Sequence, residues 1–194
     1  MYFSLQICSK KIYNVDNPIL IDDAIIFKIV FQNLGIDITQ EVSNKLAEEK
    51  WRFFREKILL YADTIPALNE LANDFILILC IDGVAKYEEK IMEQLGLKDI
   101  FNFIIVTSEI GSSKAQEKTW KIILEKYNCS IEEGIVIDDR PSVLLTANKI
   151  GFKTVRVRRG KYAAEENIVS PSFEVASLKQ AVPIIKKEIL KESL

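Results

Sequence analysis

The sequence of 194 residues has no histidine. Without an imidazole there is no Ser–His or Cys–His pair for nucleophilic catalysis, no histidine ligand for a metal ion and no histidine-based pH switch. The three cysteines lie far apart in the sequence, so we expect neither a disulfide framework nor a cysteine-rich zinc site. Any chemistry therefore has to come from carboxylates, lysines, arginines and hydroxyls.

Long hydrophobic runs and an excess of charge are also missing. The longest apolar run, Phe75 to Ile81, has seven residues and is too short to cross a bilayer. The first residues do not show a basic segment followed by a long apolar stretch, so we expect no signal peptide. With 26 basic and 28 acidic residues the net charge is −2, which favours neither nucleic acid nor an anionic membrane as a partner. These features predict a folded cytoplasmic protein.

From residue 75 onward, short apolar runs alternate with amphipathic helices. Apolar runs without polar alternation are typical of strands buried on both faces, and helices between them are typical of a parallel sheet covered on both sides. The sequence therefore predicts an α/β fold of three layers with a Rossmann-like parallel sheet. The predicted strands are 2–7, 76–81, 103–107, 134–138 and 153–157, with a short last strand at 173–175.

Two long helices, predicted over 19–34 and 39–61, separate the first strand from the second. A stretch of this length is too long for a connecting loop. We therefore predict a small helical cap at 18–61, inserted after the first strand over the strand ends, and a core made of 1–17 and 62–194. The residues expected to hold the cap in place are Phe27, Phe31, Leu46 and Phe54.

Aromatic and basic residues alternate in the second cap helix, around Trp51, Phe53 and Phe54. Such a pattern is found on surfaces that hold nucleotides. The alternative is that these aromatics pack helices together while the charged residues face water, which their helical spacing explains.

Polar residues stand at the carboxyl ends of the predicted strands, where open parallel sheets bind ligands. Asp138 and Asp139 are adjacent carboxylates that repel each other unless a cation lies between them, and oxygen ligands of this kind suit magnesium. The alternative is that one of them caps the helix that begins near Ser142. Lys114 is expected to open a helix and to present its ammonium group to a phosphate, or else to be a solvated lysine at a position that the helix dipole disfavours.

Several segments in this order resemble the haloacid dehalogenase-like hydrolases, and the resemblance covers nearly the whole chain. The segments are Thr107-Ser108-Glu109-Ile110-Gly111 with Lys114, Ile137-Asp138-Asp139-Arg140-Pro141, and Arg158-Arg159-Gly160-Lys161-Tyr162. The resemblance implies a Rossmann-like core with a helical cap and with the first strand in the centre, flanked by the second and the fourth. It also implies bound magnesium and hydrolysis of phosphate esters or carbon–halogen bonds.

The same resemblance implies roles for single residues. In the family, an aspartate ending the first strand is the nucleophile, and a second aspartate two residues later is the general acid and base. A hydroxyl after the second strand and a lysine near the third bind the phosphoryl group, and acidic residues after the fourth hold magnesium. Here Lys114 matches the phosphate-binding lysine and Asp138, with Asp139, the metal ligands. The second-strand phosphate loop corresponds to Asp82 and Gly83.

The sequence departs from the family at the positions that carry the chemistry. Ser4 and Gln6 stand in place of the two aspartates, and Ile81 stands in place of the hydroxyl residue. Ser4 has no histidine to activate it and Gln6 cannot transfer a proton. Loss of the nucleophile in an organised site typically costs about 10⁴–10⁶ in rate.

We therefore expect a catalytically impaired member of the family, with weak or absent magnesium binding. Its expected ligand is a phosphorylated small molecule or a protein partner. The alternative is an active, phosphatase-like hydrolase that depends on magnesium and uses an unusual active site. A third possibility is an assembly module that forms a homo-oligomer through its cap.

Overall fold

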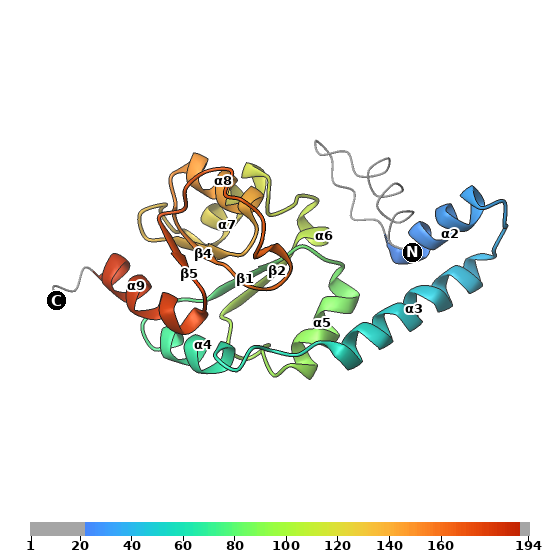
Figure 1. The fold of residues 1–194 in the computed structure, drawn as a ribbon, viewed down its shortest axis with the longest axis horizontal. Helices are drawn as coiled ribbons and strands as arrows, with labels where there is room; N and C mark the ends of the chain where they lie inside the picture. The colour runs from blue at the N-terminus through green and yellow to red at the C-terminus, as the bar shows by residue number, and fades with distance from the viewer. Residues whose placement is uncertain (1–21, 191–194) are drawn as a thin grey trace.

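The structure, a computed structural model, describes residues 22–190 (Figure 1). The first predicted strand, with Ser4 and Gln6, lies outside the described residues. The elements in chain order are α2 (Asp23–Asn33), α3 (Gln40–Lys57), α4 (Thr64–Ala72), β1 (Ile78–Ile81), α5 (Ala85–Gln94), β2 (Phe103–Val106), α6 (Thr107–Ile110), α7 (Glu117–Tyr127), β3 (Ile135–Asp138), α8 (Pro141–Ile150), β4 (Lys153–Val157), a 3₁₀ turn at Gly160–Tyr162, β5 (Phe173–Val175) and α9 (Leu178–Leu190). No helix within the described part is both long and apolar enough to cross a membrane.

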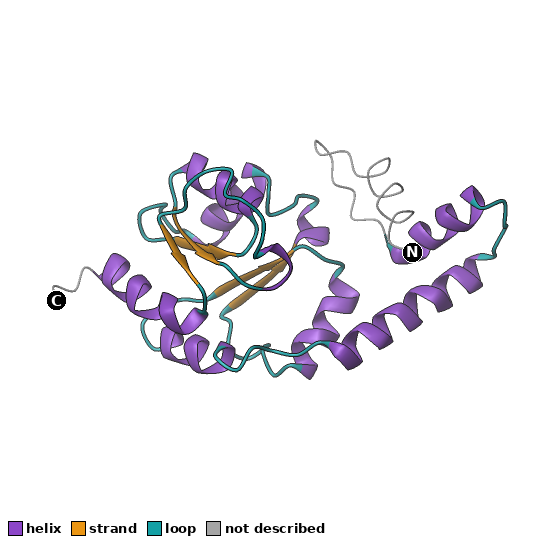
Figure 2. Ribbon diagram, viewed as in Figure 1, coloured by secondary structure: helices purple, strands orange, loops and turns teal. Residues whose placement is uncertain are grey.

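The strands form two parallel sheets, β1-β2 and β3-β4-β5, with helices on both sides (Figure 2). Ile78 of β1 pairs with Phe103 of β2, and Ile135 of β3 pairs with Lys153 of β4. The α/β class and the parallel strand direction are confirmed. Within residues 22–190, β1 and β3 each keep one edge without a strand partner. We call the boundary between β1 and β3 the seam; the ion pair of Asp82, after β1, with Arg140, after β3, spans it.

The seam explains one error in the sequence analysis. The run from Phe75 to Ile81 was expected to form a strand buried on both faces. The strand is shorter, and all four of its residues are only partly buried. An apolar run indicates that a strand lies in a hydrophobic core. Full burial of its side chains also needs neighbouring strands on both edges. Among the described residues, β1 has a neighbouring strand on one edge only.

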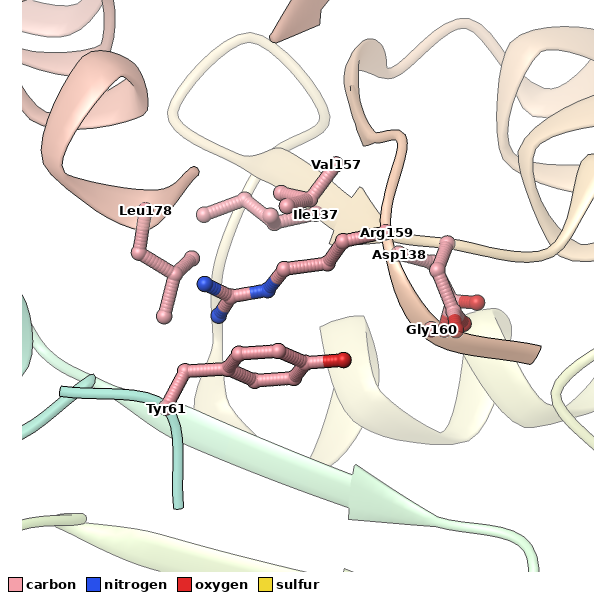
Figure 3. A pocket seen from close by; sticks show the side chains of 8 residues that line it. Tyr61, Ile137, Asp138, Val157, Arg159, Gly160 and Leu178 are labelled. Carbon is pink, nitrogen blue, oxygen red and sulfur yellow. The ribbon is translucent and has the colours of Figure 1, made fainter. Parts of the chain in front are cut away.

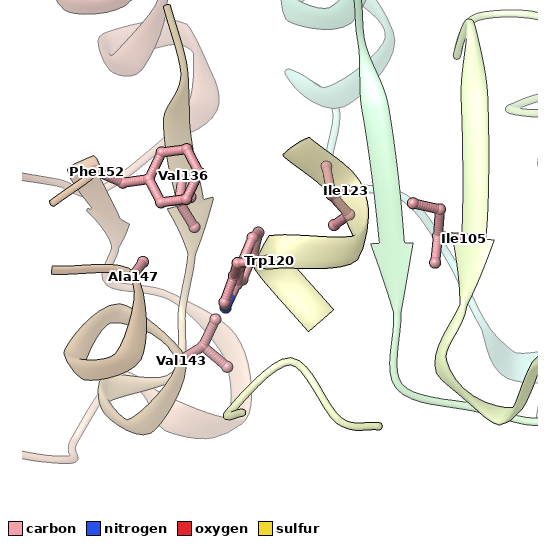
Figure 4. Close-up of a cluster of buried hydrophobic side chains, with 7 residues drawn as sticks. All are labelled: Ile105, Trp120, Ile123, Val136, Val143, Ala147 and Phe152. Atoms are coloured by element: carbon pink, nitrogen blue, oxygen red, sulfur yellow. The ribbon is translucent and has the colours of Figure 1, made fainter. Parts of the chain in front are cut away.

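Helices bridge the seam on both faces and join the sheets into one core. On one face, Trp120 and Ile123 of α7 lie between Val136 of β3 and Ile105 of β2 (Figure 4). On the other face, Leu71 of α4 packs with residues of β4 and α9. Burial of side chains of this size stabilises a fold by roughly 1.5–3 kcal/mol each, so the helices, not strand pairing, hold the described halves together.

Helix boundaries differ from the predicted ones at two places near the strand ends. The strand expected to run to Thr107 stops one residue earlier, because Thr107 begins the short helix α6. The next helix was expected to open at about Lys114 but begins at Glu117, after an extended residue at Gln116. Lys114 therefore lies in a loop, and the argument from the helix dipole does not apply to it.

Helices α2 and α3 pack against each other and project from the core (Figure 1). Thr39 caps α3 by accepting a hydrogen bond from the Val42 amide. Phe54, one of the residues expected to hold this hairpin, is 47% exposed, and its ring packs edge-on against Trp51 with the centroids 5.6 Å apart. The hairpin reaches the core through Trp51, whose ring stacks on Tyr87 of α5. Packing is therefore the role of Trp51.

Candidate functional site

Four charged side chains from four different segments meet at the carboxyl ends of the strands. Asp82 follows β1, Lys114 lies in the loop before α7, Asp138 ends β3 and Arg140 precedes α8. The Lys114 ammonium contacts Asp138 Oδ2 at 2.6 Å, and the Arg140 guanidinium donates to Asp82 Oδ2. Each ion pair spans the seam between the two sheets.

Main-chain hydrogen bonds connect the two ion pairs to each other. The Lys114 amide donates to Asp82 Oδ1 at 2.9 Å, and the Arg140 amide donates to Asp138 Oδ1 at 2.9 Å. Each carboxylate therefore holds the side chain of one cation and the main chain of the other. We call this group of four residues the charge square. The Asp138 side chain is only 7% exposed, whereas those of Lys114 and Arg140 are 18% and 23% exposed.

The loop that carries Lys114 is fixed by hydrogen bonds from helices α7 and α8. The Trp120 indole donates to the Lys114 carbonyl at 2.9 Å, and the Thr119 hydroxyl donates to the Ser113 carbonyl at 2.7 Å. The Thr146 hydroxyl donates to the Ala115 carbonyl at 2.8 Å. Sequence reasoning missed the two threonines. Their signal was a hydroxyl residue among the apolar positions of a core-facing helix.

Asp139 is the second carboxylate of the predicted metal site. Burial, and then the negative charge of Asp138, raise the pKa of Asp139 above its ordinary value. The alternative capping role is not observed, since within residues 22–190 neither carboxylate accepts a hydrogen bond from Ser142 or Val143 in the first turn of α8. A cation bound between Asp138 and Asp139 would stabilise the anionic form of Asp139, which burial and the charge of Asp138 disfavour.

The chemistry of these two carboxylates fits a magnesium ion. The described part of the chain holds no cluster of three or more Asp, Glu, Cys or His side chains suited to a metal ion. Magnesium is commonly held by one or two carboxylates, with water and substrate phosphate oxygens completing its shell. Asp138 and Asp139 would hold the ion, and both oxygens of Asp138 already accept hydrogen bonds from the protein.

The predicted phosphate-binding residues Asp82 and Gly83 have different surroundings from those expected. The Asp82 carboxylate already accepts two hydrogen bonds, from the Lys114 amide and the Arg140 guanidinium, so its contacts position these two residues. At Gly83, an added Cβ would meet the Glu88 carboxylate, the flexible end of that side chain, which would have to shift to make room. Burial raises the pKa of Glu88.

Cys80 lies on β1 beneath the charge square. Burial, and then the negative charges of Asp82 and Asp138, raise the pKa of its thiol to about 12, against the opposing effect of the Lys114 charge. A thiol with such a pKa is almost entirely protonated at neutral pH and is a poor nucleophile. Cys80 therefore contributes packing and not covalent chemistry.

A cavity of about 280 Å³ lies beside the two aspartates (Figure 3). Its wall includes Arg159, which pairs with Asp63 at 2.7 Å and lies over the Tyr61 ring at 4.1 Å from the centroid. Arg156, fully buried below, anchors this loop by donating to the carbonyls of Tyr162 and Glu165. The residues that line the cavity are Tyr61, Ile137, Asp138, Asp139, Val157, Arg159, Gly160 and Leu178.

The arrangement can be compared with known proteins. The profile of the family described as haloacid dehalogenase-like hydrolase matches residues 21–157. This match covers β1, β2, β3 and β4 and all four residues of the charge square. It does not extend over Ser4 and Gln6.

Curated relatives carry phosphatase names. Glyceraldehyde 3-phosphate phosphatase from Methanopyrus kandleri is 28% identical over 132 residues, which are 66% of this chain and 57% of the relative. The protein of the same name from Methanocaldococcus jannaschii is 29% identical over 128 residues, 65% of this chain and 56% of the relative. The chain thus spans a little over half the length of these relatives.

Solved structures share the fold. The putative HAD-hydrolase YfnB from Bacillus subtilis, determined with bound magnesium, superposes with a TM-score of 0.66 at 19% identity. The superposition covers 82% of this chain and 69% of the other. At this level of identity the likeness concerns the fold alone.

Proposed function

Because the chain belongs to the family of haloacid dehalogenase-like hydrolases, we propose that it binds a small phosphate monoester at the charge square and that its hydrolytic activity is impaired. The observation that carries the proposal is the Lys114–Asp138 ion pair of 2.6 Å at the carboxyl ends of the strands. The Lys114 ammonium can contact a phosphate, and the neighbouring carboxylates of Asp138 and Asp139 can hold a metal ion bound to that phosphate.

Three further observations support a small phosphorylated ligand. The relatives named above are phosphatases of a phosphorylated three-carbon compound. The cavity beside Asp138 has a volume of about 280 Å³, which suits a small molecule. The same cavity has Arg159 and Tyr61 in its wall, polar groups that can orient the remainder of such a molecule.

The first motif is the basis for the proposed impairment. That motif needs two aspartates separated by one residue, and residues 1–21 contain a single aspartate, Asp16. One assignment places Ser4 and Gln6 at the two positions. A second assignment places Asn14 and Asp16 there, and it is favoured by Asp22, which is held by Lys86 at 2.7 Å beside the end of β1, six residues after Asp16. In both assignments the nucleophile position lacks a carboxylate.

The second candidate function is an active, magnesium-dependent phosphatase. The adjacent Asp138 and Asp139 favour it, because a metal ion held there would lower the pKa of a bound water. This candidate requires no carboxylate nucleophile. It predicts turnover that depends on both magnesium and Asp138.

One set of measurements separates the two functions. Phosphate release from a panel of small phosphate monoesters is measured with and without magnesium, and binding of inorganic phosphate is measured by calorimetry. We expect phosphate binding with turnover near background. The double variant Ser4→Asp, Gln6→Asp and the single variant Asn14→Asp test which register carries the first motif, because only the correct one should gain activity.

The control is Asp138→Asn. Robust turnover by the natural protein that disappears in this variant would establish the second candidate and overturn the proposed impairment. An absence of phosphate binding in the natural protein would overturn the proposal as a whole.

A further inference from the structure

We propose that Arg140 binds the phosphoryl group of the ligand together with Lys114, in place of the hydroxyl that position 81 lacks. The inference rests on the proposed function and extends it to a residue whose role neither the sequence analysis nor the comparisons assign. It starts from the seam between the two sheets, where the charge square brings two cations to the same end of the strands.

The charge square holds the two cations side by side against their mutual repulsion. Asp82 accepts from the Arg140 guanidinium and from the Lys114 amide, and Asp138 accepts from the Lys114 ammonium and from the Arg140 amide. This reciprocal bonding fixes both the main chain and the side chain of each cation. Two positive groups held in this way are preorganised for an anion that bridges them.

The guanidinium has hydrogen-bonding capacity to spare. It carries five N–H donors in a planar fork, and such a fork recognises phosphate oxygens in pairs. Among residues 22–190, only Asp82 accepts from this side chain, and it does so from Nη2. The Arg140 side chain is 23% exposed, so part of it is open to solvent at the charge square.

The charge balance of the site suits an anion that arrives together with a cation. Lys114 and Arg140 balance Asp82 and Asp138, so the charge square is neutral before a ligand arrives. A phosphate that enters with a divalent cation at Asp139 adds two charges of opposite sign and meets donors on both cationic side chains. The Ile81 side chain has no hydrogen-bond donor at the end of β1. The Arg140 guanidinium reaches across the seam to Asp82, the residue that follows Ile81, and so brings donors to this place.

The competing explanation is that Arg140 is only a strap, by which we mean that its ion pair with Asp82 links the two sheets and has no role in ligand binding. Two variants separate the explanations. Arg140→Gln removes both the strap and the guanidinium. Asp82→Asn removes the strap but leaves the guanidinium in place, free of its carboxylate partner.

The experiment measures binding of inorganic phosphate in the presence of magnesium, by calorimetry, together with the unfolding midpoint of each variant. We expect Arg140→Gln to weaken phosphate binding at least tenfold and Arg140→Lys to weaken it less, because a lysine keeps the charge but loses the fork. We expect Asp82→Asn to bind phosphate at least threefold more tightly. Arg158→Gln is the matched control, since Arg158 pairs with Glu174 at 2.9 Å outside the charge square, and it should leave binding unchanged.

The outcomes distinguish this inference from the proposed function. If the natural protein binds phosphate and Lys114→Gln weakens binding while Arg140→Gln does not, the inference is wrong and the proposed function stands. If Arg140→Gln and Asp82→Asn weaken binding equally, Arg140 is a strap and the inference is wrong. If Arg140→Gln fails to fold, tighter binding by Asp82→Asn supports the inference and weaker binding overturns it.

Discussion

The indole of Trp51 lies flat on the ring of Tyr87, with the ring centroids 4.6 Å apart and the planes inclined by 12°. The indole N–H also donates to the carboxylate of Asp23, which Lys50 contacts from the same helix. Trp51 therefore connects α3 both to α2, through Asp23, and to α5, through Tyr87. Few other side chains connect the hairpin with the core.

We predict that Trp51→Ala loosens the hairpin while the sheets stay intact. The variant loses the stacked pair and leaves the Asp23 carboxylate with one partner fewer, which together cost up to about 3 kcal/mol. Hydrogen exchange measured by mass spectrometry should accelerate over residues 23–57 and remain slow in β3 and β4. The control is Phe53→Ala, because the Phe53 ring is 62% exposed. Equal exchange rates in the two variants would show that the stack does not hold the hairpin.

We predict that breaking the Lys114–Asp138 pair is costly. Both side chains are largely buried, and removal of one partner leaves the other charge without compensation, which typically costs about 3–5 kcal/mol. Lys114→Gln should lower the free energy of unfolding in urea by an amount of this order. The surface pair of Lys121 and Glu117, 3.6 Å apart, provides the control, and Lys121→Gln should cost less than about 1 kcal/mol. Similar losses in both variants would contradict the prediction.

We predict that Glu88→Gln stabilises the protein near neutral pH. Burial raises the pKa of Glu88 above its ordinary value of 4.5, so ionisation of this carboxyl opposes folding. That penalty is present above the raised pKa and vanishes as the pH falls below 4.5, where the carboxyl is protonated in both states. Urea unfolding at a series of pH values should show a gain at neutral pH that fades in acid. The matched control is Glu89→Gln on the exposed side of α5, and a gain that does not depend on pH would refute the assignment.

We predict that a strand from the first residues occupies the seam and pairs with both β1 and β3. The two free strand edges lie on either side of the seam, and helices cover it on both faces. Backbone amides of residues 2–8 should then exchange with solvent about as slowly as those of β1. Protection confined to residues 10–16 would move the strand to the register of Asn14 and Asp16. Rapid exchange throughout residues 1–21 would leave the seam without a strand from this part of the chain.

The sequence predicted the fold well wherever the local sequence of a segment determines its secondary structure. Apolar runs located β1 to β5 and their alternation with helices, and helical periodicity located α2 and α3. The differences concern relations between segments. The partial burial of β1 depends on what lies beside it, and the exposure of Phe54 depends on which face of α3 meets α5.

The candidate site was predictable in part for the same reason. Parallel strands bring their carboxyl ends together, so the proximity of Lys114 and Asp138 followed from topology. The pairing of Asp82 with Arg140 did not, because it depends on how the two sheets sit across the seam. The hydroxyls of Thr119 and Thr146 stand out in the sequence only as polar residues on core-facing helices, and their partners, which are main-chain carbonyls, do not follow from that pattern.

The seam also sets an order of events during folding. Each sheet is made of segments that follow one another along the chain, with β1 and β2 within residues 78–106 and β3 to β5 within residues 135–175. Contacts between neighbouring segments close short loops and form early, whereas docking of the two halves has to wait for both. We therefore expect refolding to pass through a species with one sheet formed and the two halves undocked. Charge-square bonds such as Lys114–Asp138 then form in the last step, so a ligand that binds there slows unfolding more than it speeds folding.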